Sequence, residues 1–375
     1  MISIPLSGAF RMVSRRIRIF FIGVKKYQGN DEQICSQIIN DCYNKQKKCF
    51  MVSNGHFKEF FARDFGWCTE ALVSLGYRQK ALDTLDYVLG TYRKHGKIMQ
   101  SISSGGAPFT FPHNLFCPDA LAFIIRSLKL AKAHQLVRKY KLFLNKEIKR
   151  YFNEVVDLKT GLVKKQVRYS SMKDHFARQS SCYDNVMCGM LAQDLNYFKD
   201  IINPFKKQGY NYKKLLMKYF WTGEYFLDDL SGSRHVAGDA NTLPFWSGLI
   251  TDRRIFRRVL ASLRREKLDR PFPLKYTKRR IKRQQAFFEN IILPDYETDA
   301  VWIHVGLMFI ISTYYFDKNL ARKYLRKYKH LILKHRNFLE VYEPDGRPFS
   351  KLVYYTDESM LWAANYLYLK KILMT

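Results

Sequence analysis

The chain contains 375 residues, of which 64 are Lys or Arg and 33 are Asp or Glu, so its formal net charge at pH 7 is +31. Hydrophobic residues make up 47% of the sequence and aromatic residues 15%. This composition excludes a disordered basic tail and provides enough apolar side chains for a sizeable core. The charge alone favours a nucleic-acid or anionic-membrane binder, because clustered Lys and Arg side chains recruit phosphate by counterion release.

The first segment, residues 1–27, mixes apolar residues with arginines and lysines. Its uninterrupted apolar runs are shorter than the about 7–15 residues of a signal-peptide core. Those elsewhere in the chain fall short of the roughly 20 residues that span a bilayer. We therefore predict a basic N-terminal segment over residues 1–27, no transmembrane helix, and a single catalytic-type domain over residues 28–375. An interfacial segment around residues 17–24 is an alternative for part of the N-terminal segment.

The seven cysteines are an odd set without the paired C-x-x-C spacing of a metal site. We expect free thiols in a reducing compartment, which predicts a cytoplasmic protein. No Gly-rich phosphate loop follows a strand, and neither an H-E-x-x-H nor a G-x-S-x-G motif occurs. We therefore expect neither a metal nor a cofactor.

Apolar residues recur at helical spacing along nearly the whole chain, and no run of residues is typical of a strand. Gly76 and Gly96 follow two such segments, as helix C-termini favour, and Pro118 opens another at a position where helices tolerate proline. In chain order, we predict helices over residues 32–45, 60–75, 78–92, 119–131, 136–152, 182–195, 212–220, 240–250, 253–263, 299–314, 319–334 and 355–371.

Long loops rich in Gly, Pro and aromatic residues separate many of these helix pairs, over residues 96–118, 157–181, 231–239, 271–297 and 337–354. Loops of this length are uncommon unless they are functional. Their recurrence on alternate connections indicates that they gather at one end of a bundle. An α-solenoid would show similar repeats at a fixed period, and these helix pairs do not resemble one another. We therefore predict an all-α fold, a closed (α/α)6 toroid of about twelve helices with long loops at one end.

Acidic residues among aromatic residues mark the loops and their junctions with helices. Aromatic rings stack on the C–H faces of sugars, and carboxylates accept hydrogen bonds from sugar hydroxyls, so this combination is typical of a carbohydrate pocket. Taken singly, an Asp at a helix start is commonly only a cap, and Arg63-Asp64 is equally explained by a local ion pair. The residues in this pattern are Asp64, Asp119, Asp184, Asp239, Asp299, Glu340 and Glu343.

Three short stretches resemble the six-hairpin glycosidases, the (α/α)6-barrel superfamily that contains glucoamylases, trehalases, glycogen-debranching glucosidases and alkaline/neutral invertases. Arg63-Asp64-Phe65 with Trp67 resembles the Arg-Asp element of that family. The stretch 118–123, P-D-A-L-A-F, is similar to its Asp-Ser/Thr-x-Leu-Trp-Phe helix start, with alanines at two positions where other residues are usual. The stretch 338–346, F-L-E-V-Y-E-P-D-G, resembles the invertase segment Trp-Pro-Glu-Tyr-Tyr-Asp.

The resemblance implies an inverting glycoside hydrolase, exo-acting on an α-glucoside or related oligosaccharide. In that interpretation Asp119 is the general acid and Glu340 is the general base, with Glu343 as its rival. Inversion requires the two carboxyl groups to stand roughly 6.5–9.5 Å apart. The substrate-binding residues implied by the family positions are Arg63, Asp64, Trp67, Asp184, Asp239, Trp246, Trp302 and His304.

Positive charge is densest over residues 253–283 and 322–336. These stretches are explained by solvated outer faces of a barrel, or by an anionic partner such as a charged glycan. The alternative function is a non-enzymatic basic helical protein that binds RNA, an anionic glycan or a membrane surface through these faces.

Overall fold

A computed structural model describes residues 6–112, 115–174, 176–279 and 293–374 of the chain. Helices dominate the described residues, and each strand in them is two residues long. The helices are α1 (Leu6–Ile22), α2 (Asp31–Asp41), α3 (Ala62–Ser74), α4 (Arg78–His95), α5 (Pro118–Leu130), α6 (His134–Lys139), α7 (Lys141–Val155), α8 (Cys182–Leu195), α9 (Pro204–Gln208), α10 (Tyr212–Tyr219), α11 (Leu243–Trp246), α12 (Arg253–Arg265), α14 (Ile303–Phe316), α15 (Lys318–His335) and α16 (Ala363–Met374). The strands are β1 (Tyr43–Asn44), β2 (Cys49–Phe50), β3 (Phe60–Phe61), β4 (Ser101–Ile102), β5 (Pro108–Phe109), β6 (Val301–Trp302) and β7 (Val341–Tyr342).

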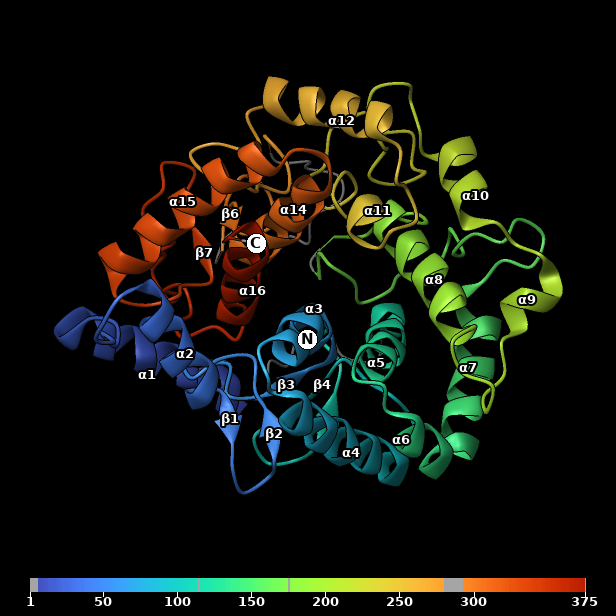
Figure 1. The fold of residues 1–375 in the computed structure, drawn as a ribbon, viewed down its shortest axis with the longest axis horizontal. Coiled ribbons are helices and arrows are strands. Elements are labelled where there is room, and N and C mark those ends of the chain that lie inside the picture. Colours follow the sequence, from blue (N-terminus) through green and yellow to red (C-terminus); the bar gives the residue numbers. More distant parts are fainter. Residues whose placement is uncertain (1–5, 113–114, 175, 280–292, 375) are drawn as a thin grey trace.

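An inner ring of helices surrounds the middle of the molecule (Figure 1). It is formed by α3, α5, α8, α11, α14 and α16, each in contact with the next, and α16 contacts α3 to close the ring. Helices α2, α4, α7, α10, α12 and α15 lie outside it, and each precedes an inner helix in the chain. The fold is therefore the predicted (α/α)6 toroid. A solenoid is excluded because the last helix packs against the first inner one.

The two rings differ in the pattern of their apolar residues. Nearly every residue of the inner helix α8 is buried, as expected for a helix packed on all sides. The outer helix α12 buries one stripe, Phe256, Val259, Ser262 and Leu263, and its arginines are exposed. The basic stretches at 253–283 and 322–336 thus fall largely on the outer helices α12 and α15 and the segment after α12, and residues 280–283 lie outside the described part.

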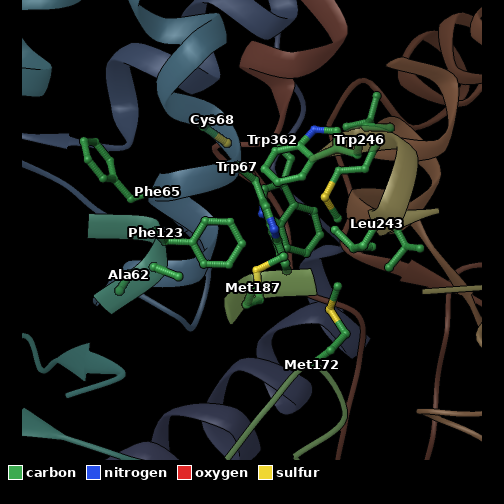
Figure 2. Packing of buried hydrophobic residues seen from close by; sticks show 14 of the residues in the cluster. Ala62, Phe65, Trp67, Cys68, Phe123, Met172, Met187, Leu243, Trp246 and Trp362 are labelled. Atoms are coloured by element: carbon green, nitrogen blue, oxygen red, sulfur yellow. The ribbon is translucent and has the colours of Figure 1, made fainter. Parts of the chain in front are cut away.

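Large aromatic side chains fill the barrel interior (Figure 2). The Trp67 ring lies 5.8 Å from that of Phe123 and 6.5 Å from that of Trp362, and Phe123 lies 6.1 Å from Trp246, centroid to centroid. Gly66 permits the close approach of α3 to α5, since a Cβ at this position would stand 2.4 Å from the Phe123 ring. The inner wall of the toroid is therefore a packed core.

Two short antiparallel sheets lie where inner helices begin. Strands β3, β4 and β5 form one sheet, in which Phe60 pairs with Ile102 and Ser101 with Phe109, and β3 leads directly into α3. Strands β6 and β7 form another, and β6 leads directly into α14. The long loops thus converge at the end of the barrel where α3 and α14 start.

The predicted helix boundaries are close for most elements and wrong for three. The segment 240–250 contains only the single turn α11, because Pro244 lies at its start and Gly248, with a φ of +78°, follows its end. The segment 136–152 forms two helices, α6 and α7. Residues 355–362 precede α16 in an extended course that pairs Ser53 with Met360.

All seven cysteines are free, as the sequence predicts, and all of them are buried. Within the described ranges, none of the helices combines the length and the apolar character that crossing a membrane requires.

Candidate active site

A cavity of about 240 Å³ opens at the end of the barrel where α3 and α14 begin. Its walls combine aromatic rings with carboxyl groups, and they come from α3, α14 and the long loops. The lining residues are Val52, His56, Phe57, Glu59, Phe61, Arg63, Asp64, Trp67, Gln100, Phe109, Phe111, Met172, Asp174, Tyr276, Leu293, Tyr296, Glu297, Trp302, His304, Glu340, Tyr354, Met360 and Trp362.

The first turn of α3 supplies Arg63 and Asp64 to the cavity, and Trp67 follows one turn later. The Trp362 indole N–H donates to Asp64 Oδ1 at 2.9 Å. Burial raises the pKa of Asp64 to about 7, although the positive charge of Arg63 and the indole hydrogen bond lower it. The negative charge of Glu340 raises this pKa further, which places the two carboxyl groups within electrostatic reach of each other. Asp64 therefore exchanges its proton near neutral pH.

Glu340 lies directly before β7 and is buried among hydrogen-bond donors. Tyr296 Oη donates to Glu340 Oε1 at 3.0 Å, while Tyr354 Oη and the Asp357 backbone N–H donate to Oε2. Burial raises the pKa of Glu340, and so does the negative charge of Asp357. A carboxylate held in this way is a stronger base than one in water.

Asp357 lies behind Glu340 and is fully buried. Its carboxylate accepts the backbone N–H groups of His56 and Phe57 at 2.8 and 3.2 Å, and it also accepts the Ser53 hydroxyl. Although burial would raise the pKa of Asp357, the contact with His56 and the Arg15 guanidinium lower it below its usual range. The 337–359 loop, which carries Glu340, is thus fastened to the segment before α3 and to helix α1.

Asp174 enters the cavity from the 169–181 loop. Gln100 Nε2 and Ser170 Oγ donate to Asp174 Oδ1 at 3.4 and 3.2 Å, and Arg63 Nη2 lies 3.7 Å from the same oxygen. The side chain retains 22% of its exposure. The backbone N–H of Asp174 donates to Glu297 Oε1 at 3.0 Å, so this loop meets the segment that carries Tyr296 and Glu297.

A buried ion network anchors the 169–181 loop. Lys173 and Arg178 are both buried, and their cationic groups lie 3.1 Å from the nearest Asp228 oxygen. They also reach Asp239, at 3.5 and 2.9 Å respectively. Burial opposes ionisation of Asp228, yet the charges of Lys173 and Arg178 hold the pKa of this carboxyl well below its usual range. Since Lys173 separates the cavity residues Met172 and Asp174, the network fixes the direction in which both point.

Asp119 lies in the first turn of α5 and is not among the cavity-lining residues. The side chain is fully buried, with its Oδ2 atom 2.6 Å from both Arg63 Nε and Tyr183 Oη. The Cys117 thiol donates to the other oxygen at 2.9 Å. The carboxylate thus holds the Arg63 guanidinium from behind, and the guanidinium lies between it and the cavity.

Several buried polar atoms of the cavity wall have no hydrogen-bond partner within the described part of the chain: Arg63 Nη2, Trp67 Nε1, His304 Nδ1 and His56 Nε2. The His304 ring stacks on Trp67 with centroids 4.5 Å apart and planes 9° apart. Burial lowers the pKa of His304 well below its usual value, so its imidazole is neutral. Because buried polar groups are nearly always paired, these atoms are suited to bind the hydroxyl groups of a ligand.

Of the residues predicted from the sequence, Arg63, Asp64, Trp67, Trp302, His304 and Glu340 come together around the cavity. The others lie elsewhere. Asp184 accepts hydrogen bonds from Ser171 and Ser181, and Asp239 belongs to the buried ion network. Trp246 packs against Phe123 in the barrel interior, and Glu343 pairs with Lys351 at 2.9 Å outside the cavity. Burial and charge pairing explain these residues without a ligand.

Many cavity-lining residues that lie in loops were not predicted from the sequence. Asp174 lacks a helix start beside it, and His56, Glu59 and Glu297 stand in loops of no characteristic spacing. The sequence pattern could have indicated Trp362 and Tyr354, because both lie in the aromatic stretch that follows Glu340. In the described ranges no group of three or more His, Cys, Asp and Glu side chains is arranged to hold a metal ion.

The fold defines the class of architecture, an (α/α)6 toroid, and solved structures share it over most of the chain. No family model matches its sequence, and no curated protein matches it by sequence. A structure titled as a wild-type glycosidase superposes with a TM-score of 0.66 at 11% identity, covering 99% of each chain. A variant of a glycosidase in complex with glucose gives a TM-score of 0.67, again at 11% identity and with 99% of each chain covered.

Two further neighbours have more specific titles. A rhamnosidase from Klebsiella oxytoca with rhamnose bound matches with a TM-score of 0.66 at 10% identity, over 91% of this chain and 63% of that one. The GH63 mannosylglycerate hydrolase from Thermus thermophilus, in complex with Tris, matches with a TM-score of 0.62 at 13% identity, over 91% of this chain and 99% of that one. At such identities these likenesses establish the fold.

Proposed function

We propose that the chain is a glycoside hydrolase that removes a terminal sugar from an α-glucoside or a related oligosaccharide with inversion at the anomeric carbon. The observation that carries this proposal is the cavity itself, in which carboxyl groups, aromatic rings and unpaired buried polar atoms converge at one end of the toroid. The proposal is supported by the glycosidase titles of the structures that share the fold.

Glu340 is the general base in this mechanism. A general base must be ionised and must reach a water molecule inside the cavity. Glu340 lines the cavity, and its raised pKa increases its affinity for a proton taken from water. Tyr296, Tyr354 and the Asp357 N–H fix its two oxygens, so the carboxylate keeps one orientation.

Asp174 is the general acid in this mechanism. The sequence predicts Asp119 for this role, but Asp119 lies behind Arg63 and does not line the cavity. Asp174 does line it, and its carboxyl group meets Gln100, Ser170 and Arg63. Asp174 comes from the 169–181 loop and Glu340 from the 337–359 loop, so two separate segments supply the pair of carboxyl groups that an inverting mechanism uses. Asp119 becomes a positioning residue that orients Arg63.

Asp64 and Arg63 bind hydroxyl groups of the terminal sugar, as the family resemblance implies. We assign Asp64 to the side of the base, since the negative charge of Glu340 acts on the pKa of Asp64. Trp67 and His304 offer unpaired ring nitrogens to the sugar, and Trp302 offers an aromatic face. Charged and neutral partners together fix the sugar in one pose.

In the proposed reaction, water hydrolyses the glycosidic bond. Asp174 donates its proton to the glycosidic oxygen, and the bond between that oxygen and the anomeric carbon breaks. Glu340 removes a proton from a water molecule on the opposite face of the ring, and the water oxygen bonds to the anomeric carbon. The products are the released alcohol and a sugar of inverted anomeric configuration, and proton exchange with solvent restores both carboxyl groups.

A hydrolysis screen with anomer-resolved NMR tests the function. The substrates are α-linked disaccharides, maltooligosaccharides and α-rhamnosides, and the expected product is the β anomer at early times. Glu340→Gln should reduce kcat by about 10²–10⁴-fold. Retention of configuration would contradict the mechanism, and full activity of the Glu340→Gln variant would contradict the site.

A glycosyl fluoride separates the proposed acid from the other carboxylates, because fluoride leaves without a proton. Asp174→Asn should lose activity on the glycoside by about 10²–10⁴-fold and keep most of its activity on the fluoride. Asp119→Asn should impair both substrates alike, since it displaces Arg63. If Asp119→Asn is the variant that the fluoride rescues, Asp119 is the acid and our assignment of Asp174 is wrong.

A further inference from the structure

Over residues 13–22, helix α1 presents an apolar stripe to solvent, which is the reverse of an ordinary surface helix. Ile17, Phe20, Phe21 and Ile22 retain between 56% and 79% of their exposure, and Val13 extends the stripe toward the start of the helix. Phe20 and Phe21 contact each other edge to face, with centroids 5.2 Å apart. We call these residues the α1 apolar stripe. Contiguous exposed apolar surface of this kind marks an interaction site.

The opposite face of α1, where Arg15 and Ile19 are buried, is fixed to the barrel. Arg15 is buried and donates to the carbonyl groups of Tyr355 and Thr356 at 2.9 and 3.0 Å. Arg18 Nη2 lies 2.6 Å from Glu358 Oε1. The helix is therefore held by charge pairing against the 337–359 loop, and this attachment keeps the apolar stripe outward.

Cations surround the α1 apolar stripe. Arg16 and Arg18 lie beside it on the same helix, and Lys25 and Lys26 are exposed just after it. Arg18 pairs with Glu358 and Lys25 with Asp41, and these two basic side chains remain 50% and 47% exposed. Arg16 also donates to the backbone carbonyl of Lys351, so the neighbouring Leu352, which is 91% exposed, adds apolar surface at the edge of the stripe. Apolar side chains bordered by Arg and Lys are the composition of a helix that lies in the interface of an anionic bilayer.

We propose that the α1 apolar stripe binds the surface of an anionic lipid membrane, with Phe20, Phe21 and Ile22 inserted among the lipids and the surrounding cations on the headgroups. The positive charge around the stripe favours an anionic membrane over a second copy of the chain. A second copy of the chain would bring two sets of these cations together, on molecules that each carry a net charge of +31. A nucleic acid would attract the cations but would leave the aliphatic Ile17 and Ile22 in water.

Vesicle co-sedimentation tests this proposal with the full-length chain. The vesicles contain either phosphatidylcholine alone or phosphatidylcholine with ~30% phosphatidylserine, the kind of anionic lipid that attracts basic segments. Binding is expected to the anionic vesicles and to weaken as salt is added. The variant Ile17→Ser/Phe20→Ser/Phe21→Ser should lower the affinity ~10-fold or more, because it removes the inserted apolar surface.

The matched control is Leu142→Ser/Leu158→Ser, which removes apolar side chains that are 86% and 57% exposed elsewhere on the surface. Its vesicle binding should equal that of the wild type. Two measurements test the electrostatic contribution independently of how the serine variant folds. One is the salt dependence of vesicle binding by the wild type, and the other is vesicle binding by the variant Arg16→Gln/Lys26→Gln. Equal binding of the serine variant and the wild type would overturn the proposal. The proposal would also be overturned if the wild type bound no vesicles and instead formed dimers that the serine variant does not form. Preferential binding of RNA over anionic vesicles would overturn it as well.

Discussion

The two loops that supply the proposed catalytic carboxyl groups are held in place by different means. The 169–181 loop is anchored by a buried ion network, in which Lys173 and Arg178 meet Asp228 and Asp239. In the 337–359 loop, Arg15 and Arg18 of α1 pair with Asp357 and Glu358, whereas Glu340 itself accepts hydrogen bonds from hydroxyl and backbone N–H groups. Neutral donors allow the pKa of Glu340 to remain raised, whereas cations next to a carboxylate would lower it. The kind of group that contacts a carboxylate, neutral donor or cation, therefore determines whether its pKa is raised, as a general base requires.

The largest expected effect tests the ion network. Lys173→Met leaves Asp228 and Asp239 buried with one cation fewer, so the free energy of unfolding should fall by about 3–5 kcal/mol. Urea denaturation followed by circular dichroism measures the loss. Lys165→Met, which removes an exposed lysine from the same connection between α7 and α8, should leave the stability unchanged. A Lys173→Met variant as stable as the wild type would show that the loop does not depend on this network.

The next effect concerns the 337–359 loop. Arg15→Met removes a cation that stabilises the ionised form of Asp357, and stability at neutral pH should fall by about 1–3 kcal/mol. Because the folded-state pKa of Asp357 lies below its ordinary value of 3.8, this stabilisation is present above pH 3.8 and is lost as the pH falls through the folded pKa. The difference between variant and wild type should therefore shrink below about pH 4. Arg16→Met, on the same helix, serves as the control, and a pH-independent difference would argue against the role of Asp357.

A smaller effect concerns Asp64, between the two loops. Its carboxyl group has a pKa of about 7, so it ionises as the pH rises through neutrality. The ionised form accepts stronger hydrogen bonds from sugar hydroxyls, and KM for the glycoside should fall across this range. The KM of Asp64→Asn should be higher and should vary little between pH 6 and pH 8, an interval of about one unit on either side of that pKa. A variant that keeps the wild-type pH dependence would assign the titration to another group.

The smallest effect distinguishes an aromatic residue of the cavity from one of the core. Trp302→Phe shortens the ring that faces the cavity and removes its hydrogen bond to the Tyr296 carbonyl, so KM should rise ~3–10-fold. Trp246→Phe should leave KM unchanged, because Trp246 packs on Phe123 and Arg126 away from the cavity. Equal effects on KM would mean that Trp246 also contacts the substrate.

The sequence predicted the fold more completely than the site. Helical periodicity and the alternating long loops were sufficient for a closed ring of helix pairs, because an inner helix is apolar on all sides and an outer helix on one. The helix predicted over residues 240–250 is longer than the single turn α11, since Asp239 and Asn241 resemble a helix start while their side chains contact the ion network and the Phe226 backbone.

The candidate site was predicted where a helix start marks it, as for Arg63 and Asp64, and where a motif does, as for Glu340. The pattern of an Asp at the first turn of an inner helix is the same for Asp64, Asp119 and Asp184. Only the tertiary structure separates them, because Asp119 and Asp184 find their partners within the protein, and Asp64 faces the cavity. Asp174 could not be found from the sequence, since its direction depends on the ion pairs of its neighbour Lys173.

The contact between α16 and α3 has a consequence for how the molecule assembles. Lys370 and Tyr366 of α16 also bind Asp31 of α2, so the ring is closed by segments more than 300 residues apart in the chain. During synthesis the apolar side of α3 can find only one of its two inner neighbours until the last helix leaves the ribosome. Such non-local contacts slow folding and expose apolar surface in the interval. Glu340 and Trp362 belong to the part of the cavity lining that is synthesised last.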